Sequence, residues 1–156
     1  MQKTYLIKKL CQQILFGYNF ISTYFISDFA TPIAKFITNF GGALFLITLT
    51  IILIIAIKNK KFPTIILLNL IISAGLNFLL KNILQRPRPT EFRLINESGF
   101  SFPSGHSMVS LAFYGLLIYL IYKYVKNKKI KWSLIIFLNI LIIFIGISRI
   151  YLGVHY

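Results

Sequence analysis

The two histidines of this chain, His106 and His155, are the residues best suited to chemistry, and each ends a short polar motif. The motifs read KNILQRPRP at 81–89, PSGH at 103–106 and SRIYLGVH at 148–155. Arginine presents planar donors to phosphate oxygens, and lysine adds a point charge. A neutral histidine can attack phosphorus while a protonated one donates to the leaving oxygen. This combination predicts phosphoryl transfer.

The acidic residues are too few to hold a divalent metal. Only Asp28, Glu91 and Glu97 carry side-chain carboxylates, against 17 lysines and arginines. The single cysteine, Cys11, rules out an internal disulfide and a cysteine-rich metal site. We therefore expect a reaction that uses no metal and no other cofactor.

Each motif alone also has an ordinary structural interpretation. Arg86 and Arg88 can anchor a helix end to lipid phosphates, and Ser104 can cap a helix whose first turn carries a surface His106. Arg149 can extend from a membrane segment to the interface. Taken together the motifs favour a phosphate site, because a helix start preceded by Ser and Gly exposes N–H groups to an anion. An arginine within an apolar segment is, in addition, a functional candidate.

The elements that must position these motifs are apolar enough to cross a membrane. The 156 residues are 57% hydrophobic with a mean hydropathy of +0.77, too apolar for an ordinary soluble domain. A spanning helix needs about 20 mostly apolar residues. Four stretches qualify: 37–57, 62–80, 107–125 and 132–147, the last of which can continue towards Leu152. The sequence predicts an all-α, polytopic membrane helix bundle.

The positive charge lies in loops between these stretches. A net charge of +14 could indicate a nucleic-acid partner, but the lysines form short clusters, KNKK at 58–61 and KNKKIK at 126–131. Such clusters are typical of cytoplasmic membrane loops, so we expect a bilayer and no nucleic acid as partner. The loop 81–106 and the end 148–156 then share the extracytoplasmic face. We expect an integral protein of the bacterial cytoplasmic membrane, with its active site on that face.

The N-terminal segment 10–26 is uncharged but carries several polar residues. One face of the predicted helix is apolar: Leu10, Ile14, Tyr18, Ile21 and Phe25. This pattern favours a helix in the membrane interface, and a fifth span is the alternative. The chain thus divides into an N-terminal segment, 1–36, and a helix bundle, 37–156.

The three motifs, in this order, resemble the pattern of the type 2 phosphatidic acid phosphatase superfamily of integral membrane lipid phosphatases. That pattern is Lys-x6-Arg-Pro, Pro-Ser-Gly-His and Ser-Arg-x5-His. Lys81 with Arg88-Pro89 matches the first part at full spacing, 103–106 the second, and 148–155 the third. The resemblance covers roughly residues 36–156.

The resemblance implies a role for each matching residue. His155 corresponds to the nucleophile that forms a phosphohistidine, and His106 to the general acid. The phosphate is held by further residues of the motifs: Lys81, Arg88, Arg149, Ser104 and the backbone N–H of Gly105. The implied substrate is a lipid phosphate or diphosphate, such as undecaprenyl diphosphate, phosphatidylglycerophosphate or phosphatidic acid.

The family pattern continues past the nucleophile with an acidic residue and a sixth span, whereas this chain ends at Tyr156. Glu91 and Glu97 lie in the other loop and do not match the position of that acid. The chain is therefore interpreted as a truncated member or a fragment. The alternative function is that of a non-catalytic homologue that binds anionic lipid phosphate or a partner chain. The sequence leaves the oligomeric state open.

Overall fold

Helices form the regular structure of the described part of the chain. The structure, a computed structural model, describes residues 26–88, 94, 95, 97 and 99–154. In chain order the helices are α2 (Ala30–Asn39), α3 (Ala43–Ala56), α4 (Lys61–Leu84), α5 (Gly105–Tyr124) and α6 (Lys128–Tyr151). The last three are each long and apolar enough to cross a membrane. The predicted all-α membrane bundle is confirmed.

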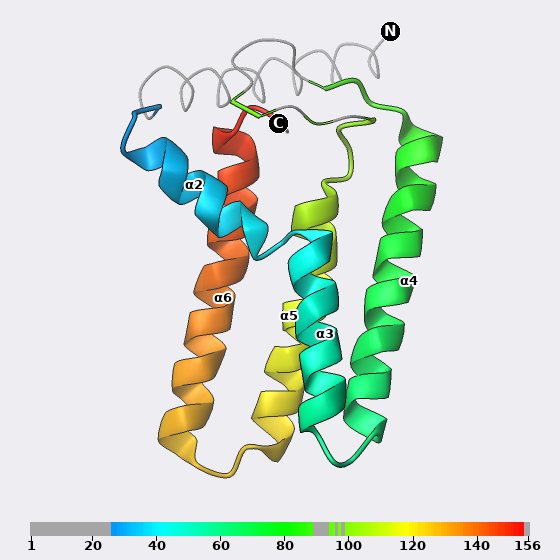
Figure 1. Ribbon diagram of the computed structural model, residues 1–156, viewed down its shortest axis with the longest axis vertical. Coiled ribbons are helices and arrows are strands. Elements are labelled where there is room, and N and C mark those ends of the chain that lie inside the picture. The colour runs from blue at the N-terminus through cyan, green and yellow to red at the C-terminus, as the bar shows by residue number, and fades with distance from the viewer. Residues whose placement is uncertain (1–25, 89–93, 96, 98, 155–156) are drawn as a thin grey trace, which may run out of the picture.

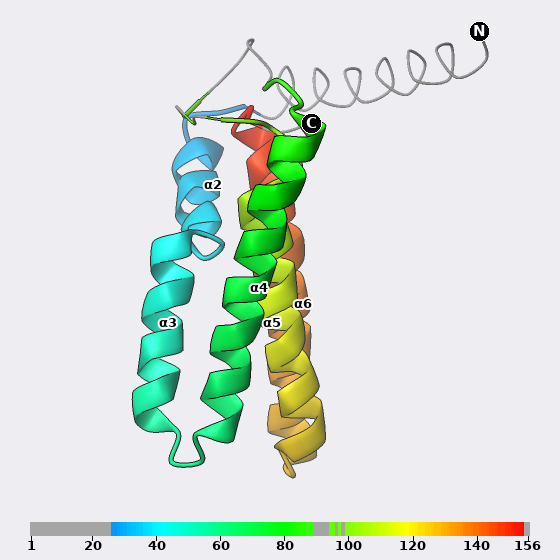
Figure 2. The same cartoon turned by 90° about the vertical axis from the view of Figure 1, so that its right-hand side faces the viewer.

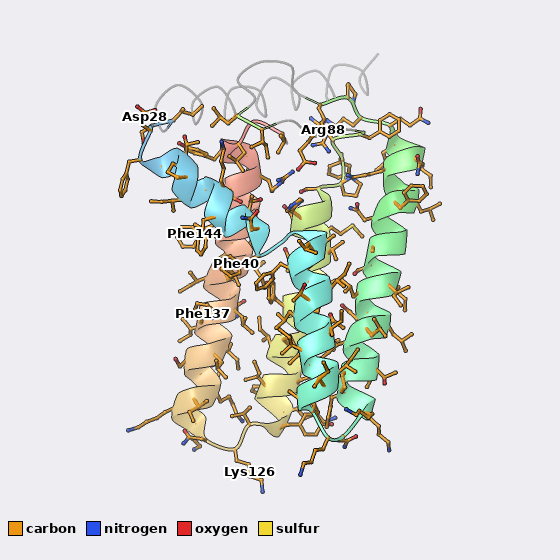
Figure 3. The ribbon with its side chains drawn as sticks, in the orientation of Figure 1. Asp28, Phe40, Arg88, Lys126, Phe137 and Phe144 are labelled. Atoms are coloured by element: carbon orange, nitrogen blue, oxygen red, sulfur yellow. The ribbon has the colours of Figure 1, made fainter. Side chains whose placement is uncertain are left out.

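Helix α5 is the centre of the bundle, with α4 on one side and α6 on the other (Figure 1). Helix α3 packs against α4 and α5, whereas α2 packs against α6 (Figure 2). The short α3–α4 and α5–α6 connections lie at one end of the bundle, and the long α4–α5 connection lies at the other. Figure 3 shows Lys126 at the first end and Arg88 at the second. The two lysine clusters therefore share one end, opposite the motifs.

The predicted first span, 37–57, is not a single helix. Helices α2 and α3 are separated by a break at residues 40–42 and are bent by 46° relative to each other. Gly41 and Gly42 occupy the break, and paired small residues are a common cause of helix kinks. The described residues therefore contain three continuous helices that could span a membrane, and a fourth only if the bent pair crosses as one unit. That pair begins at Ala30 rather than at residue 37.

The other helices differ from their predicted bounds at the ends. Helix α4 continues past Leu80, so Lys81 lies in its last turn instead of ending the span. It stops at Gln85, which takes a left-handed conformation with φ 44°. Helix α6 begins earlier than predicted because the Asn127 side chain accepts from the N–H groups of Lys129 and Ile130, at 3.0 and 3.2 Å.

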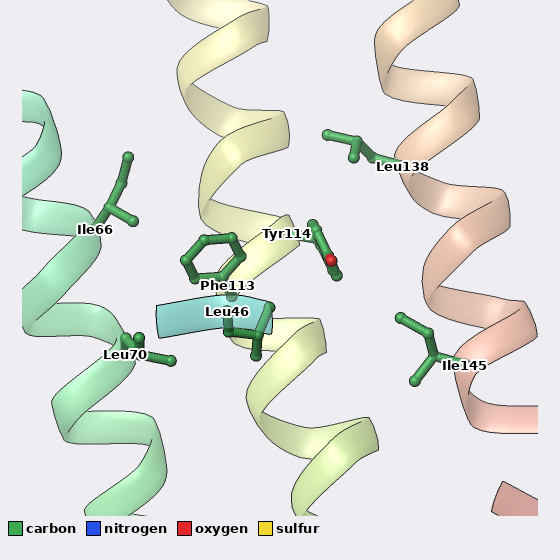
Figure 4. Close-up of a cluster of buried hydrophobic side chains, with 7 residues drawn as sticks. All are labelled: Leu46, Ile66, Leu70, Phe113, Tyr114, Leu138 and Ile145. Atoms are coloured by element: carbon green, nitrogen blue, oxygen red, sulfur yellow. The ribbon is translucent and has the colours of Figure 1, made fainter. Parts of the chain in front are cut away.

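A cluster of buried apolar side chains joins four helices (Figure 4). Its members are Leu46, Ile66, Leu70, Phe113, Tyr114, Leu138 and Ile145. Phe113 lies on the α4 side of α5 and Tyr114 on the α6 side. Outward-facing apolar residues remain exposed, for example Phe137 at 60%. An apolar outer surface around a packed centre is what a bundle surrounded by lipid requires.

The predicted N-terminal helix, 10–26, lies outside the described residues except for Ile26, and so does Cys11. Its interfacial or spanning character stays a prediction. Helix α2 runs across residue 36. The division of the chain into 1–36 and 37–156 likewise stays a prediction.

Candidate active site

The PSGH motif forms the N-terminus of α5, as its residue types predict. The Ser104 hydroxyl caps the helix by accepting from the Ser107 N–H at 3.3 Å and from the Ser107 hydroxyl at 3.2 Å. Its own proton is therefore left for another acceptor. Gly105 starts the helix, and His106 lies in the first turn. The free N–H groups of this turn form an anion-binding end.

Asn77, a buried polar residue of α4, fixes this motif from the side. Its amide donates to the Pro103 carbonyl at 3.3 Å. A Cβ at Gly105 would lie 3.3 Å from Asn77 Oδ1, so glycine permits this close approach. The sequence analysis did not single out Asn77. The sequence nevertheless pointed to Asn77, because a polar side chain inside an apolar span usually faces a polar site.

Arg149, in the last turn of α6, is almost fully buried, with 1% of its surface exposed. Its Nη2 donates to Glu97 Oε1 at 2.9 Å and its Nη1 to Thr38 Oγ1 at 3.3 Å. Among the residues that the structure describes, its Nε is buried and has no hydrogen-bond partner. A guanidinium held in this way has an N–H group left to donate to a ligand, and phosphate oxygens match its geometry.

Arg88 joins three segments of chain at the same end. Its Nε donates to the Gly99 carbonyl at 3.0 Å, and its Nη1 to the Val154 carbonyl at 3.1 Å. Its Nη2 lies 3.9 Å from Glu97 Oε2. Part of the Arg88 guanidinium therefore fixes the backbone instead of facing a ligand. Val154 is fully buried and is the last described residue.

Ser101 ties the first motif to the second. Its N–H donates to the Arg86 carbonyl at 2.8 Å, and its hydroxyl donates to the Pro87 carbonyl at 2.7 Å. These bonds hold the residues that follow α4 beside the residues that precede α5. The two ends of the α4–α5 connection thus lie side by side.

Glu97 is a charged residue between the two buried arginines that the sequence analysis set aside. Partial burial alone would raise the pKa of this carboxyl, but the hydrogen bond and the charge of Arg149 outweigh burial. His106 and Arg88 add smaller effects, and the pKa lies below its ordinary value of 4.5. Glu97 is therefore an anion held between two buried guanidinium groups, and it marks where a bound anion would be stabilised. The rarity of acidic residues could have singled out Glu97 in the sequence, since the chain has only three carboxylate side chains.

The predicted site residues that can be seen lie at one end of the bundle. The charges of Arg149, Glu97, Lys81 and Arg88 are all close enough to act on His106. Lys81 comes from α4, His106 from α5 and Arg149 from α6. His155 and Pro89 lie outside the described residues, so the place of the predicted nucleophile stays a prediction.

Two grooves flank α5 at this end. The larger, of about 570 Å³, lies between α5 and α6, with Arg86, Ser104 and Arg149 at its polar end. The smaller, of about 270 Å³, lies between α3, α4 and α5 and is lined by His106 and apolar side chains such as Leu70. Arg149 lines the first groove and His106 the second. The arrangement can hold a phosphate at the end of α5 with an apolar chain beside it.

This chain is similar to known proteins. The PAP2 superfamily model matches residues 62–156, which contain all three motifs. Phosphatidylglycerophosphatase B of Bacillus subtilis (strain 168) is 35% identical over 128 residues, which make up 77% of this chain and 61% of that protein. The chain therefore spans less than two thirds of the length of this curated relative.

Two crystal structures share the fold. One is the first transmembrane PAP2 type phosphatidylglycerolphosphate phosphatase, from Bacillus subtilis, with a TM-score of 0.81 and 30% identity over 92% of this chain and 75% of that one. Aquifex aeolicus LpxE has a TM-score of 0.73 over 90% of this chain and 81% of its own, and at 22% identity the likeness concerns the fold alone. The family resemblance drawn from the motifs is thus confirmed: this chain belongs to the PAP2 superfamily.

Proposed function

We propose that this chain carries the active site of a metal-independent membrane phosphatase that hydrolyses a lipid phosphate or diphosphate. The observation that carries the proposal is the buried Arg149 beside the N-terminus of α5, whose Nε has no hydrogen-bond partner among the described residues. The similarity to a phosphatidylglycerophosphatase makes phosphatidylglycerophosphate the first substrate to test. Undecaprenyl diphosphate and phosphatidic acid remain candidates, since both carry a phosphate next to an apolar chain.

The reaction needs two displacements at phosphorus. In the first, a neutral nitrogen of His155 bonds to phosphorus as the bond to the lipid oxygen breaks. The departing oxygen keeps the electron pair and takes a proton from His106. In the second, water bonds to phosphorus as the phosphorus–nitrogen bond breaks, and His106 takes the proton of the water. Arg149, Lys81 and the α5 N–H groups stabilise the phosphoryl oxygens in both steps.

The position of His106 indicates where the lipid lies. A general acid must reach the leaving oxygen, and that oxygen belongs to the part of the substrate that departs with the apolar chains. His106 lines the groove between α3, α4 and α5, together with Leu46 and Leu70. We place the lipid chain in this groove and the phosphate between His106 and Arg149.

The cellular orientation rests on charge. The lysine clusters lie at the end opposite the site, and short lysine-rich loops stay in the cytoplasm. This supports a site on the extracytoplasmic face of a bacterial cytoplasmic membrane. Metal independence is supported by the available side chains: in the described ranges, no three His, Cys, Asp or Glu residues gather as ligands.

Phosphate release by the purified chain in detergent micelles tests the proposal. Each of the three lipids is supplied with EDTA present, and inorganic phosphate is measured. We expect EDTA-resistant release by the wild-type chain and none by His155→Ala or His106→Ala, while Lys126→Gln at the opposite end keeps full activity. With radiolabelled substrate, the wild-type chain should carry phosphate that is stable to base and labile to acid, as expected for phosphohistidine.

Other outcomes separate the alternatives. Release that disappears with EDTA would contradict the metal-independent mechanism. Saturable binding of the lipid without release would favour the non-catalytic role. In that role the phosphate clamp, formed by Arg149, Lys81 and the N–H groups at the start of α5, would hold an anionic lipid. Release that survives in His155→Ala would remove the proposed nucleophile.

A further inference from the structure

The break between α2 and α3 lies directly against His106. A Cβ at Gly41 would lie 3.2 Å from the His106 carbonyl oxygen and 3.4 Å from its Cβ. On the other side it would lie 2.7 Å from Ile145 Cγ2, closer than real side chains approach. A Cβ at Gly42 would lie 3.1 Å from the Asn39 carbonyl oxygen and 3.7 Å from His106 Nε2, the latter an ordinary van der Waals distance. Gly41 thus allows the backbone of the break to pack closely against the residue that carries the imidazole ring.

Tyr114 lies further along α5 than His106 and holds the break in place. Its side chain is 2% exposed, and its hydroxyl donates to the Phe40 carbonyl at 2.7 Å. A break in a membrane helix leaves carbonyl groups without their helical partners, and lipid offers no replacement. Tyr114 supplies that partner from the helix that carries His106. The hydrogen bond therefore connects the position of the break to α5.

The break also reaches the phosphate clamp. Thr38, in the last turn of α2, accepts from Arg149 Nη1 at 3.3 Å. The two halves of the bent pair have different partners, since α2 packs against α6 and α3 against α4 and α5. The bend lets one segment contact both His106 and Arg149. A straight helix over 30–56 would lose its contact with one of these two residues.

We propose that Tyr114 and the Gly41–Gly42 pair are positioning residues of the active site, holding the helix break against His106 so that its ring stays oriented towards the leaving oxygen. Within the described ranges, no hydrogen bond to the His106 ring is found, so packing against the break is the restraint that this part of the chain provides. The inference rests on the proposed function, in which His106 is the general acid.

The chemistry of the leaving group separates positioning from general damage. An alkyl phosphate needs a proton on its departing oxygen, whereas an aryl phosphate such as p-nitrophenyl phosphate leaves with little help. General acid catalysis contributes about 10²- to 10⁴-fold, so partial misplacement of His106 should cost about tenfold in kcat on the lipid phosphate. Tyr114→Phe and Gly41→Ala should show this loss on the lipid and little loss on the aryl ester.

Matched controls come from the same helix. Gly115→Ala adds a methyl where nothing lies within 4 Å, and Tyr122→Phe removes an exposed hydroxyl near the other end of α5. Both should keep the wild-type ratio of the two rates. Equal losses on both substrates in Tyr114→Phe and Gly41→Ala would overturn the inference, because they would report a smaller folded fraction.

A second measurement does not depend on activity. The chain has only two histidines, so His155→Ala assigns the ring resonances of His106 in an NMR spectrum of the micelle-bound protein. Tyr114→Phe and Gly41→Ala should shift the His106 resonance, and the two controls should leave it in place. An unmoved resonance would overturn the positioning role. A chain that releases no phosphate from either substrate, yet shows the shifts, would contradict the proposed function and retain the contact between break and histidine.

Discussion

Both ends of the bundle carry positively charged side chains, but these are buried at one end and exposed at the other. At the end with the motifs, Arg149 and Arg88 are 1% and 8% exposed, and Glu97 is bonded between them. At the other end, Lys126 and Lys128 are exposed to solvent. Burying a guanidinium is costly unless hydrogen bonds and an opposite charge compensate. We therefore interpret the buried arginines as held in place for a ligand, and the exposed lysines as suited to lipid headgroups and orientation.

The hydrogen bonds of the two ends differ in the same sense. At the motif end, bonds cross between distant segments, such as Arg88 to Val154 and Arg149 to Thr38. At the lysine end, the side-chain bonds described are local, such as Asn127 to the N–H of Lys129. Changes at the motif end should consequently alter several segments together, whereas changes at the lysine end should stay local.

Among the changes that compare the charged residues of the two ends, Arg149→Lys should have the largest effect. Lysine keeps the charge but cannot reach Glu97, Thr38 and a phosphate with one planar group. Removing a preorganised donor of this kind costs about 10²- to 10³-fold in kcat. Phosphate release under saturating lipid measures it. Arg86→Lys, at the rim of the larger groove, is the matched change and should cost clearly less; equal losses would place Arg86 in the clamp as well.

Glu97→Gln should alter the acid stability of the chain. Because Arg149 holds the pKa of Glu97 below 4.5 in the folded chain, the unfolded chain binds the proton at a higher pH. The stability from this ion pair is complete above the ordinary pKa and is lost as the pH falls through the lower, folded value. The midpoint of thermal unfolding of the wild-type chain should therefore drop on acidification, and that of Glu97→Gln should drop less.

Asp28→Asn provides the control for this titration. Asp28 is an exposed carboxylate at the same end of the bundle. Its removal should leave the acid sensitivity of the wild-type chain unchanged. Identical pH profiles for wild type and Glu97→Gln would show that the contact with Arg149 contributes nothing to folding.

The motif end was easier to predict as chemistry than as structure. Ser104 as a cap and His106 in the first turn follow from local residue types, so sequence alone predicts them. Glu97 and Thr38 contact Arg149 across sequence separations of 52 and 111 residues, and no local pattern encodes such pairs. The break at Gly41 was hidden inside an apolar run, because hydropathy does not register which neighbour each half of a helix packs against.

Ser104→Ala should have an intermediate effect. The substitution removes both the cap of α5, worth about 1 kcal/mol, and a hydroxyl that can donate to phosphate. Ser104→Gly separates these roles, since glycine caps nearly as well and lacks the hydroxyl. We expect unfolding measurements to show a loss in Ser104→Ala only, and phosphate release to fall about tenfold in both, the cost of a hydrogen bond to a charged group. Full activity in Ser104→Gly would mean that Ser104 caps α5 but does not donate to the phosphate.

The smallest effect on turnover is expected at the lysine end. Replacing Lys126, Lys128 and Lys129 with glutamine removes three exposed charges. Helix α6 has 24 residues, so its two ends lie about 36 Å apart, several times the Debye length of about 8 Å at physiological salt. Phosphate release in micelles should therefore match the wild-type rate.

Membrane orientation is the property that the same triple variant should change, because short lysine loops determine which end stays in the cytoplasm. Labelling of single cysteines from each side of intact cells, in a Cys11→Ser background, would report a larger inverted fraction than in the wild-type chain. A fall in micellar turnover with unchanged orientation would reverse the assignment. It would mean that the lysine end influences catalysis over the length of the bundle, and that exposed charge there does more than orient the protein.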